Sequence, residues 1–277
     1  MDELSQIDLA FCVDLTNSMT GFIQAARAHM LDILNALTGA AQADLRVALA
    51  GYRDYGSKTR LIEAYPFTAE RAETRGVLNG LKVASPAENT DAAEAVFAGL
   101  CACLDDLTWR PGALKIVLLV GDAPPHGCGA TGLPCPDRYP KSDPSGQTLM
   151  SMSSRIEGGG LTLHALGMVP SILPIHDPVM EKSFRWLAMT TGGTYRPARS
   201  SQDALAVVEV IGKRVFGQMD FDRRVWAELT RAEPGALPAA RRLEEQLPAV
   251  QQALGASESE IHASVARLRK RGLPRKQ

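Results

Sequence analysis

The chain has 277 residues, of which 45% are hydrophobic, and a formal net charge of −1 at pH 7. That length allows one large α/β domain plus a small appendage, and the near-neutral charge excludes a global attraction to nucleic acid or membrane. The longest apolar runs have the length of strands, which excludes a membrane span. Five unevenly spaced cysteines and an acidic start argue against a disulfide framework and a signal peptide. We therefore expect a soluble, cytoplasmic protein.

Hydrophobic periodicity predicts alternating strands and helices over the first 215 residues. In chain order they are strand 7–13, helix 18–38, strand 45–53, strand 60–64, helix 68–82, helix 90–105, strand 113–121, helix 146–157, strand 161–168, helix 177–190, strand 193–197 and helix 202–214. This alternation predicts an α/β fold with a doubly wound, mainly parallel sheet and helices on both faces. Only a short turn precedes strand 60–64, so it should be an antiparallel partner at the sheet edge.

The first predicted strand ends in a carboxylate and two hydroxyls, which belong to Asp14, Thr16 and Ser18. In an open parallel sheet, ligands bind at the carboxyl ends of the strands. Hard oxygen ligands with little formal charge suit Mg²⁺ or Mn²⁺. One carboxylate cannot hold such an ion, so the rest of the chain should supply more oxygens.

Two later segments supply them. Thr90, Asp91 and Glu94 are predicted in the first turn of a helix, where backbone N–H groups and the helix dipole favour carboxylates. The buried strand 113–121 leads directly into Asp122. Strand-end aspartates so far apart in the sequence converge only if both strands lie in one sheet, as a doubly wound fold allows.

In these three segments the chain resembles a von Willebrand factor A (vWA) domain. The metal-ion-dependent adhesion site (MIDAS) of that family combines an Asp-x-Ser-x-Ser motif, a Thr on a second loop and an Asp on a third. The matching residues are Asp14, Thr16, Ser18, Thr90 and Asp122, with Thr16 in place of the commoner Ser. Further matches at residues 47–55, 91–95 and 121–127 make the resemblance closest to the vWA domains of alpha-kinases and their bacterial relatives. It covers about residues 5–215.

The resemblance implies a vWA domain over residues 1–215 and leaves 216–277 as a helical appendage. It also implies a metal-dependent adaptor, in which a Mg²⁺ or Mn²⁺ ion keeps an open coordination position that an Asp or Glu of a protein partner completes. A similar Asp/Glu pair occurs in integrin beta chains, where the Glu joins the metal shell. Either Thr90 or Glu94 is therefore a candidate ligand, and Asp91, Glu94 and Asp54 are candidates for a further metal or for supporting contacts.

The segment 122–147 is rich in Gly and Pro and leaves the expected metal-binding end of a strand, so it should be a functional surface loop. Within and near it, Tyr55 and His126 are candidate contacts on the partner-binding rim. His126, Cys128 and Cys135 also raise the alternative of a zinc site with Asp122 or Asp137 as a fourth ligand, although their spacing matches no common zinc pattern.

The sequence contains no nucleophile elbow, phosphate-binding loop or metalloprotease motif. We therefore expect a bacterial, non-enzymatic adaptor that captures a partner carboxylate. A magnesium-dependent hydrolase of phosphate esters is an alternative, because a magnesium site can activate water.

Apolar residues at helical spacing form three short stripes in residues 216–277. The first, with Asp220 or Asp222 at its start, contains Phe221, Val225 and Leu229; the second contains Leu243, Leu247, Val250 and Leu254; the third follows a capping box at 257–260 and contains Ile261, Val265 and Leu268. This layout resembles a helix-turn-helix, in which Arg267, Arg269, Lys270 and Arg271 would contact DNA phosphates. The basic run lies only at the far end, which favours a helical hairpin that packs on protein. A DNA-associated regulator is thus an alternative function.

Overall fold

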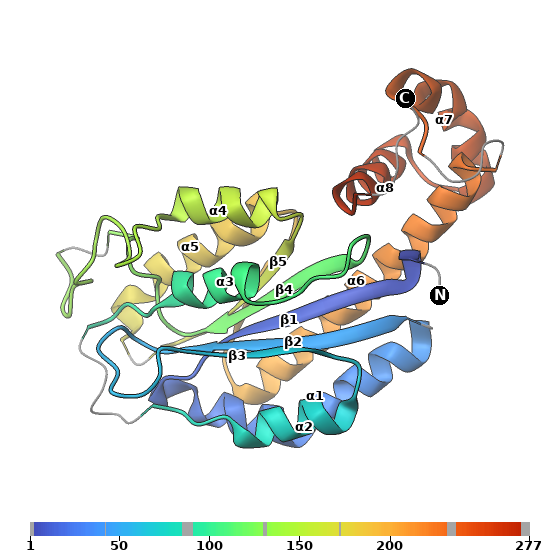
Figure 1. The fold of residues 1–277 in the computed structure, drawn as a ribbon. Helices are drawn as coiled ribbons and strands as arrows, with labels where there is room; N and C mark the ends of the chain where they lie inside the picture. Colours follow the sequence, from blue (N-terminus) through green and yellow to red (C-terminus); the bar gives the residue numbers. More distant parts are fainter. Residues whose placement is uncertain are drawn as a thin grey trace.

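The computed structural model describes residues 3–41, 43–84, 91–129, 132–171, 173–231 and 237–272. At its centre lies a six-stranded sheet with the order β3-β2-β1-β4-β5-β6 (Figure 1). The strands are β1 (Gln6–Asp14), β2 (Asp44–Tyr52), β3 (Ile62–Thr68), β4 (Leu114–Gly121), β5 (Thr162–Met168) and β6 (Tyr195–Ala198). All neighbours pair in parallel except β2 and β3. The predicted mainly parallel sheet with one antiparallel edge strand is confirmed.

Helices cover both faces of the sheet (Figure 1). One face carries α1 (Thr20–Ala41), α2 (Arg71–Gly80) and α6 (Ser201–Leu229), and the other carries α3 (Val96–Asp105), α4 (Leu149–Gly158) and α5 (Asp177–Thr190). Because both faces are covered, the central strands β1 and β4 are almost continuous buried runs. Among the described helices, none combines the length and the apolar composition that crossing a membrane requires.

The helix predicted from residue 90 begins later than expected, at Val96. Glu94 instead forms an isolated parallel bridge with Pro125: its N–H donates to the Pro124 carbonyl at 3.0 Å, and its carbonyl accepts from the His126 N–H at 3.2 Å. These bonds hold the segment in an extended form and join it to the loop after β4. The acidic residues that suggest a first helical turn therefore belong to a loop.

The prediction of a separate helix starting near Asp220 or Asp222 is wrong, because α6 continues without a break from Ser201 to Leu229. Asp222 is 1% exposed and faces Arg267, so it does not cap a helix. The helices α7 (Ala240–Leu254) and α8 (Glu258–Lys270) follow. The predicted capping box opens α8: the Ser257 side chain accepts from the Glu260 N–H, and the Glu260 carboxylate accepts from the Ser257 N–H.

The end of α6 packs with α7 and α8 around a hydrophobic core of their own, at the far end of the sheet from the carboxyl ends of the strands (Figure 1). Basic side chains join this unit to the sheet domain. The Lys270 ammonium donates to the carbonyls of Leu161 and Thr191 at 2.8 and 2.9 Å, and Arg271 Nε donates to the Gly112 carbonyl at 2.8 Å. Arg267 forms an ion pair with Asp222. Arg267, Lys270 and Arg271 therefore make contacts inside the protein, as expected of helices that pack on protein rather than of a DNA-reading face.

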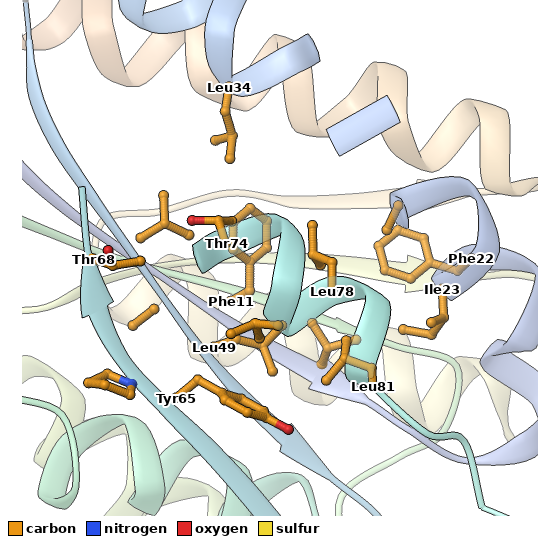
Figure 2. Close-up of a pocket in the computed structure, with 16 residues that line it drawn as sticks. Phe11, Phe22, Ile23, Leu34, Leu49, Tyr65, Thr68, Thr74, Leu78 and Leu81 are labelled. Atoms are coloured by element: carbon orange, nitrogen blue, oxygen red, sulfur yellow. The ribbon is translucent and has the colours of Figure 1, made fainter. Parts of the chain in front are cut away.

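An apolar pocket lies between α1, α2 and the β3 edge of the sheet. Figure 2 shows its side chains gathered around α2, with Phe22 and Ile23 from α1, Phe11 from β1 and Leu78 from α2 among them. Its empty volume, including the part open to solvent, is about 550 Å³. The Arg27 guanidinium holds the end of α2 over the pocket, donating to the carbonyls of Leu78 and Leu81.

Candidate metal centre

The predicted ligands gather at the carboxyl ends of the two central strands. Val13 of β1 pairs with Val120 of β4, so Asp14 and Asp122 leave adjacent strands at nearly the same level. The chain after Asp14 stays close to the sheet, because the Leu15 N–H donates to the Tyr52 carbonyl at 2.8 Å. The sheet thus brings the two aspartates together, as the sequence predicts.

Asp14 is fully buried. Its Oδ1 accepts from the Thr16 N–H at 2.7 Å, whereas its Oδ2 has no hydrogen-bond partner among the described residues. The Thr16 and Ser18 hydroxyl oxygens lie 3.0 Å apart on the same loop. Since native proteins rarely leave buried polar atoms unsatisfied, this oxygen is a candidate metal ligand.

Buried carboxylates crowd around Asp14. Burial raises the pKa of Asp14 well above its usual value, and the charge of Asp122 raises it further. The pKa of Glu94, 2% exposed, is raised in the same way by burial and then by Asp14. Burial also raises the pKa of Asp122, although contact with the Ser18 hydroxyl opposes the shift. Three buried acids that repel one another need a cation to become ionised together.

Gly121 permits this close assembly. A Cβ atom at this position would lie 2.5 Å from the Tyr52 hydroxyl and 3.5 Å from Asp14 Cβ. The Tyr52 side chain is fully buried behind the two aspartates. A side chain at Gly121 would therefore displace the Tyr52 hydroxyl from its place beside the two aspartates.

The donor set fits a hard divalent cation. Asp14, Thr16, Ser18 and Asp122 offer carboxylate and hydroxyl oxygens, and the buried Glu94 carboxyl lies close enough to be coupled electrostatically to Asp14 and Asp122. No thiolate or imidazole is part of this group, and all-oxygen sites favour Mg²⁺ or Mn²⁺. Thr90, the remaining predicted ligand, lies outside the described residues.

His126 is central to a second polar cluster beside this site. Its Nδ1 lies 2.7 Å from Asp137 Oδ1, and its Nε2 lies 2.8 Å from Asp54 Oδ1. Burial lowers the pKa of His126, but the hydrogen bonds with Asp137 and Asp54 outweigh this effect and raise the pKa to about 9. His126 is therefore a cation at neutral pH, and both ring nitrogens are engaged by carboxylates.

This arrangement changes two predictions. His126 is only 1% exposed, so its predicted place on the partner-binding rim is wrong, whereas Tyr139 beside it is 37% exposed. Asp54, Asp91 and His126 have ligand-type atoms within 4.8 Å of one another, but both ring nitrogens of His126 are already engaged, by Asp137 and Asp54. Asp54 thus serves as a partner of His126 in this structure.

The Tyr55 side chain completes the cluster. Its hydroxyl donates to Asp143 Oδ2 at 2.8 Å, and its ring centroid lies 5.5 Å from that of His126 and 6.0 Å from that of Tyr139. Asp143 also accepts from the Ser145 hydroxyl. These contacts fasten the long loop after β4 to the loop after β2. The sequence gives no local signal for Asp143 or Tyr139, because their partners lie on other loops, and it suggests Asp137 only as a possible zinc ligand.

The zinc alternative gains no support from the described residues. Neither Cys128 nor Cys135 belongs to a described group of side chains that could share a metal ion. All five cysteines are free thiols. The nearby His176 is engaged elsewhere, because its Nε2 lies 2.7 Å from the Pro134 carbonyl oxygen.

Comparison with known proteins adds a family context. No family model matches the chain. The chain is 26% identical over 141 residues to the alpha-protein kinase vwkA of Dictyostelium discoideum; the match spans 50% of this chain and 22% of that protein. The chain thus corresponds to less than a quarter of its curated relative.

Solved structures share the fold at low sequence identity. A pilus adhesin, SpaC of Lactobacillus rhamnosus GG in its open conformation, superposes with a TM-score of 0.54 at 17% identity, over 76% of this chain and 30% of the adhesin. Proximal thread matrix protein 1 from the mussel byssus, with a zinc-occupied MIDAS motif, gives 0.53 at 14% identity over 78% and 47% of the two chains. A von Willebrand factor type A protein of Catenulispora acidiphila gives 0.51 at 15% identity, over 76% and 43%.

Proposed function

We propose that this chain, which has the vWA fold and is distantly homologous to the vWA region of the alpha-protein kinase vwkA, is a metal-dependent protein-binding module. The observation that carries the proposal is the buried cluster of Asp14, Asp122 and Glu94, in which Asp14 Oδ2 has no partner among the described residues. vWA domains commonly bind protein ligands through a metal at this place in the fold. We name Mg²⁺ or Mn²⁺ as the ion because every donor is an oxygen.

In this proposal, Asp14, Thr16, Ser18 and Asp122 hold the ion, and Glu94 or Thr90 completes the protein's share. The ion would offer an open coordination position to an Asp or Glu of the partner. The residues of this chain have two further tasks. The Thr16 N–H orients Asp14, and the His126 contacts with Asp54 and Asp137 hold the neighbouring loops in place.

We also propose that the module has no enzymatic activity of its own and acts in the cytoplasm. Among the described residues, the polar side chains beside the candidate metal include no nucleophile–base pair of the kind used in covalent catalysis. The five free thiols support a reducing compartment.

The test is calorimetric titration of Mg²⁺ and Mn²⁺ into the wild-type protein and into Asp14→Ala. The wild-type protein should bind one ion, and Asp14→Ala should bind none while keeping its fold. Asp220→Ala, which removes an exposed carboxylate on α6, is the matched control and should bind as the wild-type protein does. Equal affinity in Asp14→Ala and wild type would overturn the proposal.

The partner is sought by capture from cell extract on immobilised protein with Mn²⁺ and with a chelator. A specific partner should be retained only with Mn²⁺ and only by a protein with an intact Asp14. Substitutions near Tyr55, on the rim of the site, should weaken capture without unfolding the protein. Capture that persists with chelator and in Asp14→Ala would show that the partner does not use the metal.

A further inference from the structure

Two loops beside the candidate metal centre show an unequal distribution of charge between their interior and their surface. The segments are residues 53–60, after β2, and residues 132–147, in the long loop after β4. Their three aspartates are buried, with exposed fractions of 4% for Asp54, 5% for Asp137 and 3% for Asp143. Each is engaged internally, the first two by His126 and the third by Tyr55.

The exposed charges of the same two segments are all positive. They belong to Lys58, Arg60, Arg138 and Lys141, which we call the basic rim. The side chain of Arg138 is 48% exposed, and its Nε lies 3.9 Å from Asp91 Oδ2. The exposed charge of these two segments is thus positive, although the protein as a whole has a net charge of −1.

The basic rim is held in place rather than carried on independent loops. Tyr55 hydrogen bonds to Asp143 and links the two segments directly. The backbone N–H of Arg138 donates to Asp91 Oδ2 at 2.9 Å. This bond ties the long loop to the segment that carries Glu94, three residues after Asp91. On the other segment, the buried Arg53 guanidinium donates to the Arg60 carbonyl at 2.7 Å. Figure 1 shows both loops at the same end of the sheet.

We infer that the basic rim selects an acidic protein segment, in which one carboxylate reaches the metal and neighbouring Asp or Glu side chains pair with Lys58, Arg60, Arg138 and Lys141. This inference rests on the proposed function for the role of the central carboxylate. Charge complementarity points to the partner: a cation at the metal, beside two loops that expose four basic residues, matches a run of carboxylates. Exposed pairs of this kind add modestly to affinity and increase the rate of association at low salt.

The test compares two short synthetic peptides of Gly and Ser. One has a single central Glu, and the other has Glu also at the two positions on each side. In Mn²⁺ at low salt, the acidic peptide should bind the wild-type protein about thirty-fold more tightly, as four exposed ion pairs predict. The difference should shrink to a few-fold at high salt, because exposed charges are screened.

The test variant replaces the basic rim by Lys58→Gln, Arg60→Gln, Arg138→Gln and Lys141→Gln. It should bind the two peptides with similar affinity while binding the single-Glu peptide as the wild-type protein does. The matched control is Lys213→Gln with Arg231→Gln, two exposed basic residues on and after α6, away from the metal loops. This control should keep the wild-type preference. Thermal unfolding verifies that both variants are folded.

Each outcome decides the inference. Equal binding of the two peptides by the wild-type protein, or an unchanged preference in the rim variant, would overturn it. Tighter, metal-independent binding of single-stranded DNA of equal charge would overturn it in favour of a nucleic-acid surface. A different result would separate the two proposals. If the acidic peptide binds in chelator through the basic rim and the single-Glu peptide does not bind at all, the role of the basic rim is supported and the metal-dependent function is contradicted.

Discussion

Strand β1 carries one buried aspartate near each of its ends, and the two side chains have opposite surroundings. Asp8 and Asp14 are both fully buried. The Asp8 carboxylate accepts four hydrogen bonds, from Arg46 Nε and Nη2 and from the N–H and Nε of Arg110, at 2.7–3.0 Å. Asp14 accepts one hydrogen bond, and its nearest charged neighbours are other acids.

The difference separates a charge that stabilises the fold from charges that are held for a ligand. A buried carboxylate is tolerated when donors satisfy it, as at Asp8. At Asp14 the same protein leaves one buried carboxylate oxygen without a hydrogen-bond partner among the described residues, which is typical of sites where function takes precedence over stability. The following predictions test this contrast, from the largest expected effect to the smallest.

Asp8→Ala should lower the free energy of unfolding by about 4 kcal/mol, because it leaves Arg46 and Arg110 without their shared anion. Urea denaturation measures the effect. Asp105→Ala is the control, since its ion pair with Arg155 is exposed, and it should cost less than about 1 kcal/mol. A loss at Asp8 as small as that of the control would remove the contrast between the two ends of β1.

Leu268→Ala, in the core formed by α6, α7 and α8, should cost about 3 kcal/mol because its side chain is fully buried. Arg269→Ala, at a half-buried position, should change stability by about 1 kcal/mol or less if α8 packs on protein. Denaturation of both variants measures the difference. A gel shift with duplex DNA that is tight, salt-sensitive and lost in Arg269→Ala would instead support a DNA-binding role.

Asp14→Asn should stabilise the metal-free protein by about 1–2 kcal/mol at pH 7, since it removes a charge that burial and Asp122 disfavour. The same change should abolish the rise in Tm that Mn²⁺ gives the wild-type protein. Scanning calorimetry with Mn²⁺ and with chelator measures both effects. Asp220→Asn, at an exposed position of α6, should change neither. A destabilised Asp14→Asn protein would show that Asp14 serves the fold, as Asp8 does.

Metal affinity should fall as pH falls. The pKa values of Asp14, Glu94 and Asp122 are raised in the metal-free protein, so protons compete with the ion for these carboxylates. The apparent affinity for Mn²⁺ should drop by up to about tenfold per pH unit for each proton displaced. Calorimetry in buffers of different ionisation enthalpy counts these protons, and binding without proton release would contradict the expectation.

The same shifts determine how stability depends on pH without metal. A folded-state pKa above the unfolded value adds stability below the unfolded pKa, and this stability is lost as pH rises through the folded-state pKa. For the three acids of the metal centre, the metal-free protein should therefore lose stability as pH rises above the usual carboxyl range. Saturating Mn²⁺ should oppose this loss.

The features predictable from the sequence are those with local signals. The apolar run before Asp14 and the one before Asp122 identify their strands, and the short turn before β3 identifies the antiparallel edge. The capping box of α8 is predictable for the same reason, since all its contacts lie within four residues.

The features that could not be predicted depend on contacts between distant residues. His126 is buried because the Asp54 carboxylate, 72 residues earlier in the chain, accepts a hydrogen bond from its Nε2. Asp222 lies in the middle of α6 because Arg267, 45 residues later, pairs with it, although an aspartate at this position suggests a helix start. Glu94 precedes α3 because it bonds to the loop after β4. In each case a partner from another element overrides the local preference.

The pocket beside α2 gives the protein a mechanical property as well as a shape. The part of its space that is closed to solvent is lost when the chain unfolds, so unfolding should reduce the volume of the system and hydrostatic pressure should favour it. Phe22 and Ile23 in its wall follow the hydroxyl-bearing loop by only a few residues. Compression should therefore loosen the α1–α2 side first, and ¹H–¹⁵N spectra recorded under pressure should show the earliest changes at Phe22, Ile23 and Leu78.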